Sequence, residues 1–146
     1  MTVSIDPTRL KLTNQQGTQG VLLGTRCQDC QVYVFGPAFF CQACTSSNLE
    51  AVELSQNGTL YSYTIVRVPP SGWLGPVPYM LGQVEMPEGP QVLAEIIDCH
   101  ESDLKIGMEV ELALQSVVAE GDGTVSKAVY KWRPVLLSAR AERQIL

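Results

Sequence analysis

The sequence is poor in the side chains that most enzymes use for catalysis. It has a single histidine, His100, and charged residues make up only 17% of its 146 residues. No nucleophile elbow, phosphate-binding loop or dinucleotide-binding glycine pattern occurs in it. His100 follows Cys99, but adjacent residues of an extended chain point to opposite sides, which disfavours a nucleophile–base pair. These absences favour a non-catalytic subunit or binding module over an enzyme that acts alone.

Basic residues are also scarce. Ten Lys and Arg stand against 15 Asp and Glu, which gives a net charge of -5 at pH 7. Between Glu85 and Asp122 ten acidic residues accompany one basic residue, Lys105, and five of the ten basic residues follow residue 124. A negative field disfavours general binding to a nucleic-acid backbone. The basic C-terminal segment could still meet an acidic partner surface or a small phosphorylated ligand.

Long hydrophobic segments are absent as well. No apolar run reaches the roughly 20 residues that a membrane-spanning helix needs. Met1 leads into a polar stretch, without the charged and then apolar segment of an export signal. We therefore expect a cytoplasmic protein whose cysteines are reduced. The hydrophobic share of 45% still supports a packed core, in one domain with a small appendage.

Four of the five cysteines stand in two pairs, Cys27-x-x-Cys30 and Cys41-x-x-Cys44, with ten residues between the pairs. Two such turns facing each other supply four thiolates in the tetrahedral arrangement that zinc favours. Iron could occupy the same sulfurs, whereas disulfides or a redox dithiol fit the spacing and compartment less well. We predict one structural zinc per chain. A site closed by four protein sulfurs leaves no position for water or substrate, so the metal would not catalyse.

Short apolar runs separated by glycine and proline predict a mainly β protein. Strands over 21–24 and 32–35 around the cysteine pairs indicate a rubredoxin-like zinc ribbon. Five further strands are expected over 58–68, 79–85, 91–97, 109–118 and 128–132, with a short turn at 102–106 and a hairpin turn at 120–123. Five short strands without a long helix match an OB-fold barrel. The expected organisation is an irregular N-terminal arm (1–20), the zinc ribbon (21–50), the barrel (51–135) and a basic tail (136–146).

One loop interrupts the regular strand spacing. Residues 69–78 contain four prolines and two glycines, which exclude both a helix and pairing in a sheet. Trp73 and Leu74 lie at its middle with no charged residue nearby. Trp73 could fold back to cap the barrel end, or it could contact a partner or ligand, because long loops of this kind in compact domains are often functional.

These motifs together resemble a family of zinc-ribbon plus OB-fold proteins that was first catalogued as a domain of unknown function and is often encoded beside thiolases. The resemblance covers residues 26–134, most of the chain. It is carried by Arg26-Cys27-x-x-Cys30, Phe40-Cys41-x-x-Cys44, Gly58-Thr59-Leu60-Tyr61-Ser62-Tyr63-Thr64, Pro78-Tyr79, Ile106-Gly107-Met108-x-Val110 and Arg133-Pro134. Two features depart from the family pattern. Residues 1–20 do not read as the helices that usually precede the ribbon, and Gln31 stands where a glycine often follows the first cysteine pair.

The resemblance implies a non-catalytic accessory subunit of a thiolase-type acyl-CoA enzyme. In such complexes the catalytic residues lie on a large thiolase-fold subunit, which the small subunit stabilises while it helps to shape the CoA or acyl-CoA site. The small subunits of benzoylsuccinyl-CoA thiolase, which act in anaerobic toluene breakdown, are similar in size, and we expect this chain to be such a subunit. Within this reading we expect Trp73, Leu74 and Tyr79 to contact the partner or the acyl-CoA.

The main alternative is a module that binds single-stranded nucleic acid, because zinc ribbons and OB-folds both serve that purpose. Such binding needs a basic groove with aromatic side chains on which bases stack. Tyr61, Tyr63 and Arg67 alternate along one expected strand and could supply that surface. The acidic middle of the chain argues against it.

Overall fold

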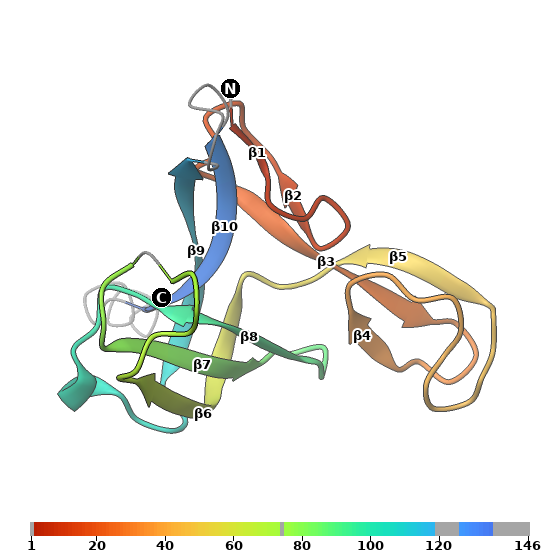
Figure 1. The fold of residues 1–146 in the computed structure, drawn as a ribbon. Helices are drawn as coiled ribbons and strands as arrows, with labels where there is room; N and C mark the ends of the chain where they lie inside the picture. The colour runs from red at the N-terminus through yellow and green to blue at the C-terminus, as the bar shows by residue number, and fades with distance from the viewer. Residues whose placement is uncertain (1, 74, 119–125, 136–146) are drawn as a thin grey trace, which may run out of the picture.

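The structure is a computed structural model that describes residues 2–73, 75–118 and 126–135. Within these ranges the chain forms ten strands and one 3₁₀ turn, with no α-helix (Figure 1). The elements are β1 (Thr2–Ser4), β2 (Leu10–Leu12), β3 (Gly20–Cys27), β4 (Tyr33–Phe35), β5 (Leu49–Glu53), β6 (Asn57–Val66), β7 (Tyr79–Glu85), β8 (Gln91–Ile96), η1 (Glu101–Asp103), β9 (Glu109–Val118) and β10 (Ser126–Pro134). The prediction of a mainly β fold is confirmed.

Strands β6 to β10 close into a five-stranded barrel. The sheet runs in the order β10–β8–β7–β6–β9, and an antiparallel pairing of β9 with β10 completes the circle. Strands β8 and β10 meet in parallel, and the other contacts between barrel strands are antiparallel. This is the closed OB-fold that the strand spacing predicted, and β7 and β9 have the expected bounds.

The hydrophobic core lies mostly inside the barrel and extends through Leu10, Leu22 and Leu54 to the N-terminal hairpin and β3. Alternate residues of the barrel strands point inward, so that the side chains of Leu60, Val84, Val92, Val110 and Trp132 are fully buried. The Trp132 indole N–H donates to the carbonyl of Val92 at 3.3 Å, so its one polar group is satisfied. Burial of large apolar side chains is therefore the main source of barrel stability.

The ribbon forms around β3, which extends from the N-terminal hairpin to the cysteine pairs (Figure 1). Strand β3 pairs antiparallel with β4 on one edge and with β5 on the other. The sequence did not predict β5, and this strand crosses the expected boundary between ribbon and barrel at residue 51. Its composition, Leu-Glu-Ala-Val-Glu, carries weak strand propensity, so its pairing with β3 determines its conformation.

The N-terminal arm differs from the irregular segment expected over residues 1–20. Strand β1 lies parallel to β10, with Thr2 opposite Ser126, and β2 pairs antiparallel with β3. Gly17 has a φ of 72°, and a Cβ atom there would lie 2.3 Å from the Thr2 side chain. Glycine is therefore required where the turn before β3 passes the first strand.

Three sequence-based expectations lie outside the described residues: the hairpin turn at 120–123, the C-terminal tail from 136 onward, and Leu74. Strands β9 and β10 pair up to Val118 and Ser126 on either side of that turn. In the part of the chain that the structure describes, no helix is long and apolar enough to cross a membrane.

Candidate metal centre and barrel groove

The four paired cysteines meet at the end of the ribbon. Their sulfur atoms all lie within 4.8 Å of one another. The Sγ atoms of Cys27 and Cys44 are 3.6 Å apart, and those of Cys30 and Cys41 are 3.4 Å apart. A tetrahedral ion with metal–sulfur bonds of about 2.3 Å would place its ligands roughly 3.8 Å apart. The cluster therefore has the size of a four-sulfur metal site.

Two backbone turns with the same hydrogen bonds hold these sulfurs. In the first turn the Cys27 N–H donates to the carbonyl of Val32 at 2.9 Å, and the Gln31 N–H donates back to the Cys27 carbonyl at 2.9 Å. In the second turn Cys41 and Thr45 take the places of Cys27 and Gln31. The Cys41 N–H donates to Ser46 at 2.8 Å, and the Thr45 N–H returns to Cys41 at 2.9 Å. The ligand pairs are thus presented by equivalent turns.

Each turn ends on a residue with left-handed backbone. Gln31 has a φ of 71° and Thr45 a φ of 63°. Such values are uncommon for residues other than glycine, and for a β-branched residue such as Thr45 they carry strain. Gln31 stands where a glycine is frequent in the family, so the sequence had already indicated this position. Thr45 is identified as its equivalent by the matching hydrogen bond to Cys41. A bound metal would offset this strain by fixing both turns.

The local electrostatics fit a cation among the sulfurs. Backbone N–H groups of Cys44 and Ala43 lower the pKa of the Cys41 thiol to about 6. For Cys44 the N–H of Ser46 acts in the same direction, but burial and the neighbouring thiols outweigh it and raise the pKa to about 12. Four sulfurs this close cannot all be thiolates unless a positive ion relieves their repulsion. The donor set therefore suits a soft divalent cation.

Polar contacts join the two turns outside the cluster. The Asp29 carboxylate accepts hydrogen bonds from the Ser46 hydroxyl and from the Asn48 side chain, the latter at 3.2 Å. At the base of the ribbon, Arg26 and Glu50 form an ion pair of 2.7 Å between β3 and β5. These contacts fix the positions of the two turns relative to each other.

Cys99 and His100 lie on the barrel, outside the metal cluster. The Cys99 thiol donates to the backbone carbonyl of His100 at 3.4 Å, and His100 is exposed. Burial raises the pKa of the Cys99 thiol, which disfavours the thiolate. The two residues therefore lack the arrangement of an activated nucleophile.

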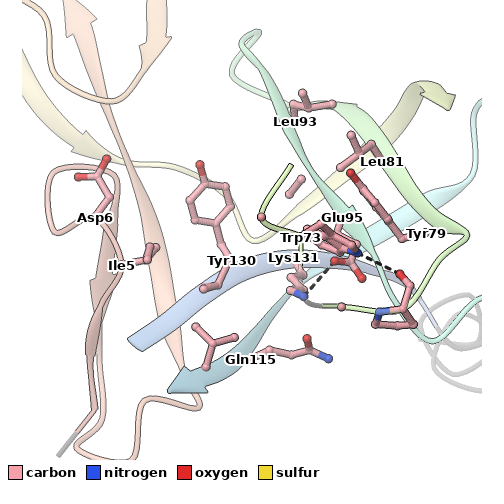
Figure 2. Close-up of a pocket in the computed structure, with 16 residues that line it drawn as sticks. Ile5, Asp6, Trp73, Tyr79, Leu81, Leu93, Glu95, Gln115, Tyr130 and Lys131 are labelled. Carbon is pink, nitrogen blue, oxygen red and sulfur yellow. Dashed lines mark hydrogen bonds and ion pairs between the residues drawn. The ribbon is translucent and has the colours of Figure 1, made fainter. Parts of the chain in front are cut away.

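A groove of about 1110 Å³ opens on the outer face of the barrel (Figure 2). Strands β7 to β10 form its floor, the loop 69–78 forms one wall, and Ile5 and Asp6 of the N-terminal arm border it. Apolar side chains that line it include Tyr79, Leu81, Leu93, Val117 and Val129. Leu93 is 58% exposed, which is unfavourable for a large apolar side chain unless something covers it.

Trp73 and Tyr79 form an aromatic stack at this groove. Their ring centroids are 4.3 Å apart with an interplanar angle of 24°, and the Trp73 indole N–H donates to the Pro76 carbonyl at 3.3 Å. A Cβ atom on Gly75 would lie 2.9 Å from the Trp73 ring. The loop thus holds Trp73 flat against Tyr79, partly exposed and outside the barrel core.

The charged groups of the groove are already paired. Lys131 and Glu95 form a mostly buried ion pair of 3.1 Å at its floor (Figure 2). Asp6 pairs with Arg9 at 2.7 Å, and hydrogen bonds from Thr8 and Arg9 lower the pKa of its carboxyl. The groove therefore presents apolar surface with balanced charge. It was not predicted from the sequence, although the outward-facing Leu93 between two inward-facing residues of β8 was an available signal.

A four-cysteine ribbon continuous with an OB-fold barrel defines the class of this protein. The family model of the ChsH2 C-terminal OB-fold domain matches residues 51–115. A DUF35 domain-containing scaffold protein of Methanocaldococcus jannaschii is 32% identical over 115 residues, which are 78% of this chain and 82% of that protein. The chain therefore belongs to the family of DUF35 domain-containing scaffold proteins, as the motifs indicated.

Two further relatives come from enzyme complexes. The benzoylsuccinyl-CoA thiolase subunit BbsA of Thauera aromatica is 30% identical over 119 residues, which are 82% of this chain and 80% of that subunit. The solved structure of the Ltp2-ChsH2(DUF35) aldolase superposes with a TM-score of 0.62 at 27% identity. That match covers 80% of this chain and 86% of the compared chain.

Proposed function

We propose that this protein is a non-catalytic accessory subunit of a thiolase-type acyl-CoA enzyme complex. The observation that carries the proposal is its similarity, over about four fifths of both chains, to a benzoylsuccinyl-CoA thiolase subunit. The similar aldolase structure supports the same role, because in it a DUF35 protein is named together with an enzyme. In this role the chain stabilises a large thiolase-fold subunit, which carries the catalytic residues.

The ribbon would contribute a structural zinc ion, held by Cys27, Cys30, Cys41 and Cys44. The distances between the sulfurs and the depressed pKa of Cys41 support this assignment. Zinc bound by four sulfurs supplies folding energy and a fixed geometry. The ribbon residues hold the turns in register and take no part in acyl transfer.

The groove would help to wall the acyl-CoA site of the complex. Trp73 and Tyr79 offer a rigid aromatic surface, and the flanking prolines reduce the entropy lost when the loop docks. Leu74 belongs to the same proposed contact surface. Because Lys131 is paired with Glu95, the described lining of the groove offers no free cation for phosphates. We therefore assign to it the apolar acyl or pantetheine part of the substrate, or apolar side chains of the partner, and assign the phosphates to the partner subunit.

Benzoylsuccinyl-CoA is the substrate that we favour for the complex, and the cytoplasm is the compartment. Identities of 30% and 31% to BbsA subunits of two organisms support the first. The need for reduced thiols in the metal centre supports the second. The substrate and the compartment are more specific assignments than the accessory role. Either of them can be wrong while the accessory role is right.

The test is purification of the tagged protein from its native cells, with identification of bound proteins by mass spectrometry. A thiolase-fold subunit should co-purify, and thiolysis of benzoylsuccinyl-CoA should require that subunit. Turnover of an acyl-CoA by this chain alone, or recovery without any thiolase-fold subunit, would contradict the proposal. Turnover of a different acyl-CoA by the complex would change the substrate only.

The same preparation tests the nucleic-acid alternative. Tyr61 and Tyr63 are exposed on β6 as that alternative requires, but Arg67 is paired with Glu101 at 2.7 Å. We expect no retention on heparin or single-stranded DNA at low salt. Strong retention, lost on substitution of both tyrosines by alanine, would favour nucleic-acid binding instead.

A further inference from the structure

The ribbon end, residues 27–49, exposes two adjacent aromatic side chains. Phe39 is 95% exposed and Phe40 is 60% exposed, and Val32 on the neighbouring turn is 40% exposed. None of these residues belongs to the hydrophobic core cluster of the described structure. Large aromatic side chains left in water are unfavourable, and contiguous exposed apolar surface commonly marks an interaction site.

The backbone that carries these two side chains is fixed at both ends. The Gly36 N–H donates to the carbonyl of Leu23 on β3 at 2.9 Å, and Cys41, which follows Phe40 directly, is a buried member of the sulfur cluster. Only four residues span the distance between these fixed points. A short anchored span loses little conformational entropy on binding, so its aromatic groups are preorganised for contact.

The surface around the two phenylalanines carries almost no unpaired charge. Asp29 is the only charged residue in 27–49, and its carboxylate already accepts hydrogen bonds from Ser46 and Asn48. Two arginines border this surface, Arg9 beside Gly36 and Arg26 on β3, and they are paired with Asp6 and Glu50, each at 2.7 Å. Without an unpaired cation among these described residues, the surface lacks the attraction that anionic membranes and nucleic acids require. Exposed aromatic residues combined with depleted charge are typical of the centre of a protein–protein interface.

The size of the patch separates two kinds of protein occupant. At their observed exposure, Phe39 and Phe40 could bury about 300 Å² per chain. Two copies of the chain that met only through these side chains would bury about 600 Å² in total, whereas a stable dimer needs at least about 1,200 Å². The patch is therefore suited to act as an anchor within a larger interface.

We propose that Phe39 and Phe40 anchor a second docking surface, which inserts into an uncharged apolar cleft on the thiolase-fold subunit. The identity of that partner rests on the proposed function. The ribbon end and the loop 69–78, which forms a wall of the barrel groove, lie on opposite sides of the molecule (Figure 1). Two contacts on one rigid chain reinforce each other, because binding at the first raises the effective concentration at the second. The partner would thus be held at both ends.

The first experiment identifies what covers the ribbon end. The photoreactive residue p-benzoylphenylalanine replaces Phe39 in the tagged full-length protein, and native cells are irradiated before purification. A cross-link to the thiolase-fold subunit supports the inference. If that subunit co-purifies but the cross-link joins a second copy of this chain, a lipid or no protein at all, the inference is overturned while the proposed function stands. Absence of any thiolase-fold subunit overturns both.

The second experiment measures the contribution of the two side chains. The double variant Phe39→Ser, Phe40→Ser should bind the purified thiolase-fold subunit about tenfold more weakly or worse, because both anchors are lost. Its melting temperature should match that of the wild type, since these side chains lie outside the core. Ile106→Ser, which removes a 62% exposed side chain from a barrel turn, is the matched control and should bind normally.

Two results of these binding measurements would overturn the inference. One is wild-type affinity of the double variant for the thiolase-fold subunit. The other is flotation of the wild-type protein, but not the double variant, with phosphatidylserine–phosphatidylcholine vesicles, which would assign the phenylalanines to a membrane. The variant Phe39→Leu keeps an apolar side chain at this position. It should retain most of the affinity for the thiolase-fold subunit, which would show that the serine variant binds weakly because apolar contact is lost.

Discussion

The barrel and the ribbon of this protein are ordered by different forces. The barrel surrounds a core in which Leu60, Val84 and Trp132 are fully buried, whereas in the ribbon end, 27–49, the only buried side chains are those of Cys27 and Cys41. The barrel is stabilised by removal of apolar surface from water, and for the ribbon end we propose stabilisation by a metal ion held by the four sulfurs. The comparison explains why the ribbon can display phenylalanines outward, since its fold does not need them inside.

The largest effect should follow from removal of a sulfur ligand. Cys27→Ser should reduce the zinc content from about one ion per chain to nearly none, because four-sulfur zinc sites contribute apparent binding energies of about 10–16 kcal/mol. The ribbon should then exchange its amide hydrogens rapidly while the barrel amides stay protected. Metal analysis and hydrogen-exchange mass spectrometry measure the two effects.

Cys99→Ser is the control for this change and should leave the metal content unaltered, since Cys99 lies outside the cluster. Intact disulfides within the pairs 27–30 and 41–44 of freshly isolated protein would contradict the assignment of a metal site. Loss of barrel protection in Cys27→Ser would contradict the separation of the two halves.

The second prediction concerns a substitution in the barrel core. Trp132→Ala should lower the free energy of unfolding by about 3–5 kcal/mol, because it leaves a large cavity and removes the hydrogen bond from the indole to the Val92 carbonyl. Urea unfolding followed by far-UV circular dichroism measures this loss. The zinc content of the folded variant should be that of the wild type, and a parallel loss of zinc would show that the ribbon depends on the barrel core.

A smaller effect is expected at the groove. Trp73→Ala should weaken binding of the thiolase-fold subunit, or raise the apparent KM for the acyl-CoA, by an amount equivalent to about 1–3 kcal/mol. It should change the melting temperature little, because Trp73 stacks on Tyr79 at the surface. Val68→Ala, an exposed position before the loop, is the control. A large fall in melting temperature with unchanged affinity would make Trp73 a packing residue.

The smallest effect concerns the N-terminal arm that joins the two halves. Hydrogen bonds from Thr8 and Arg9 lower the pKa of Asp6 below its usual 3.8, so the folded state favours the carboxylate. The resulting stability is present above pH 3.8 and is lost as the pH falls through the lowered pKa. Asp6→Asn should therefore have a lower melting temperature than the wild type at pH 7, and the two melting temperatures should converge only when the pH falls below the lowered pKa of Asp6. A difference that persists there would assign the effect to something other than this charge.

The cysteine cluster of the ribbon could be predicted from the sequence because the residues of each pair are close together in the chain. Two ligands three residues apart define a turn by themselves, so the spacing predicted four sulfurs that the structure brings within 4.8 Å. The barrel strands could be predicted for a related reason. Alternation of apolar and polar residues over 109–118 indicates a strand with one buried face. Turn residues between the strands then limited the count to five.

Strands β1 and β5 and the groove could not be predicted, because they form through contacts between residues that are far apart in the sequence. Strand β5 is composed of residues that also suit a helix, and its pairing with β3 decides the outcome. Strand β1 pairs with residues more than 120 positions away along the chain. The groove is formed by strands β7 to β10, a proline-rich loop and the N-terminal arm, so no single segment of the sequence predicts it.

The sequence by itself determined the four-cysteine cluster, the mainly β class and the apolar, proline-bounded loop, because each follows from the spacing of residues close together in the chain. Tertiary structure alone decided which surfaces are presented. It placed Trp73 against Tyr79, paired Lys131 with Glu95 inside the groove, and left Phe39 and Phe40 uncovered at the other end of the molecule. Exposure is a property of the whole fold, since a side chain is covered only by what the rest of the chain brings to it.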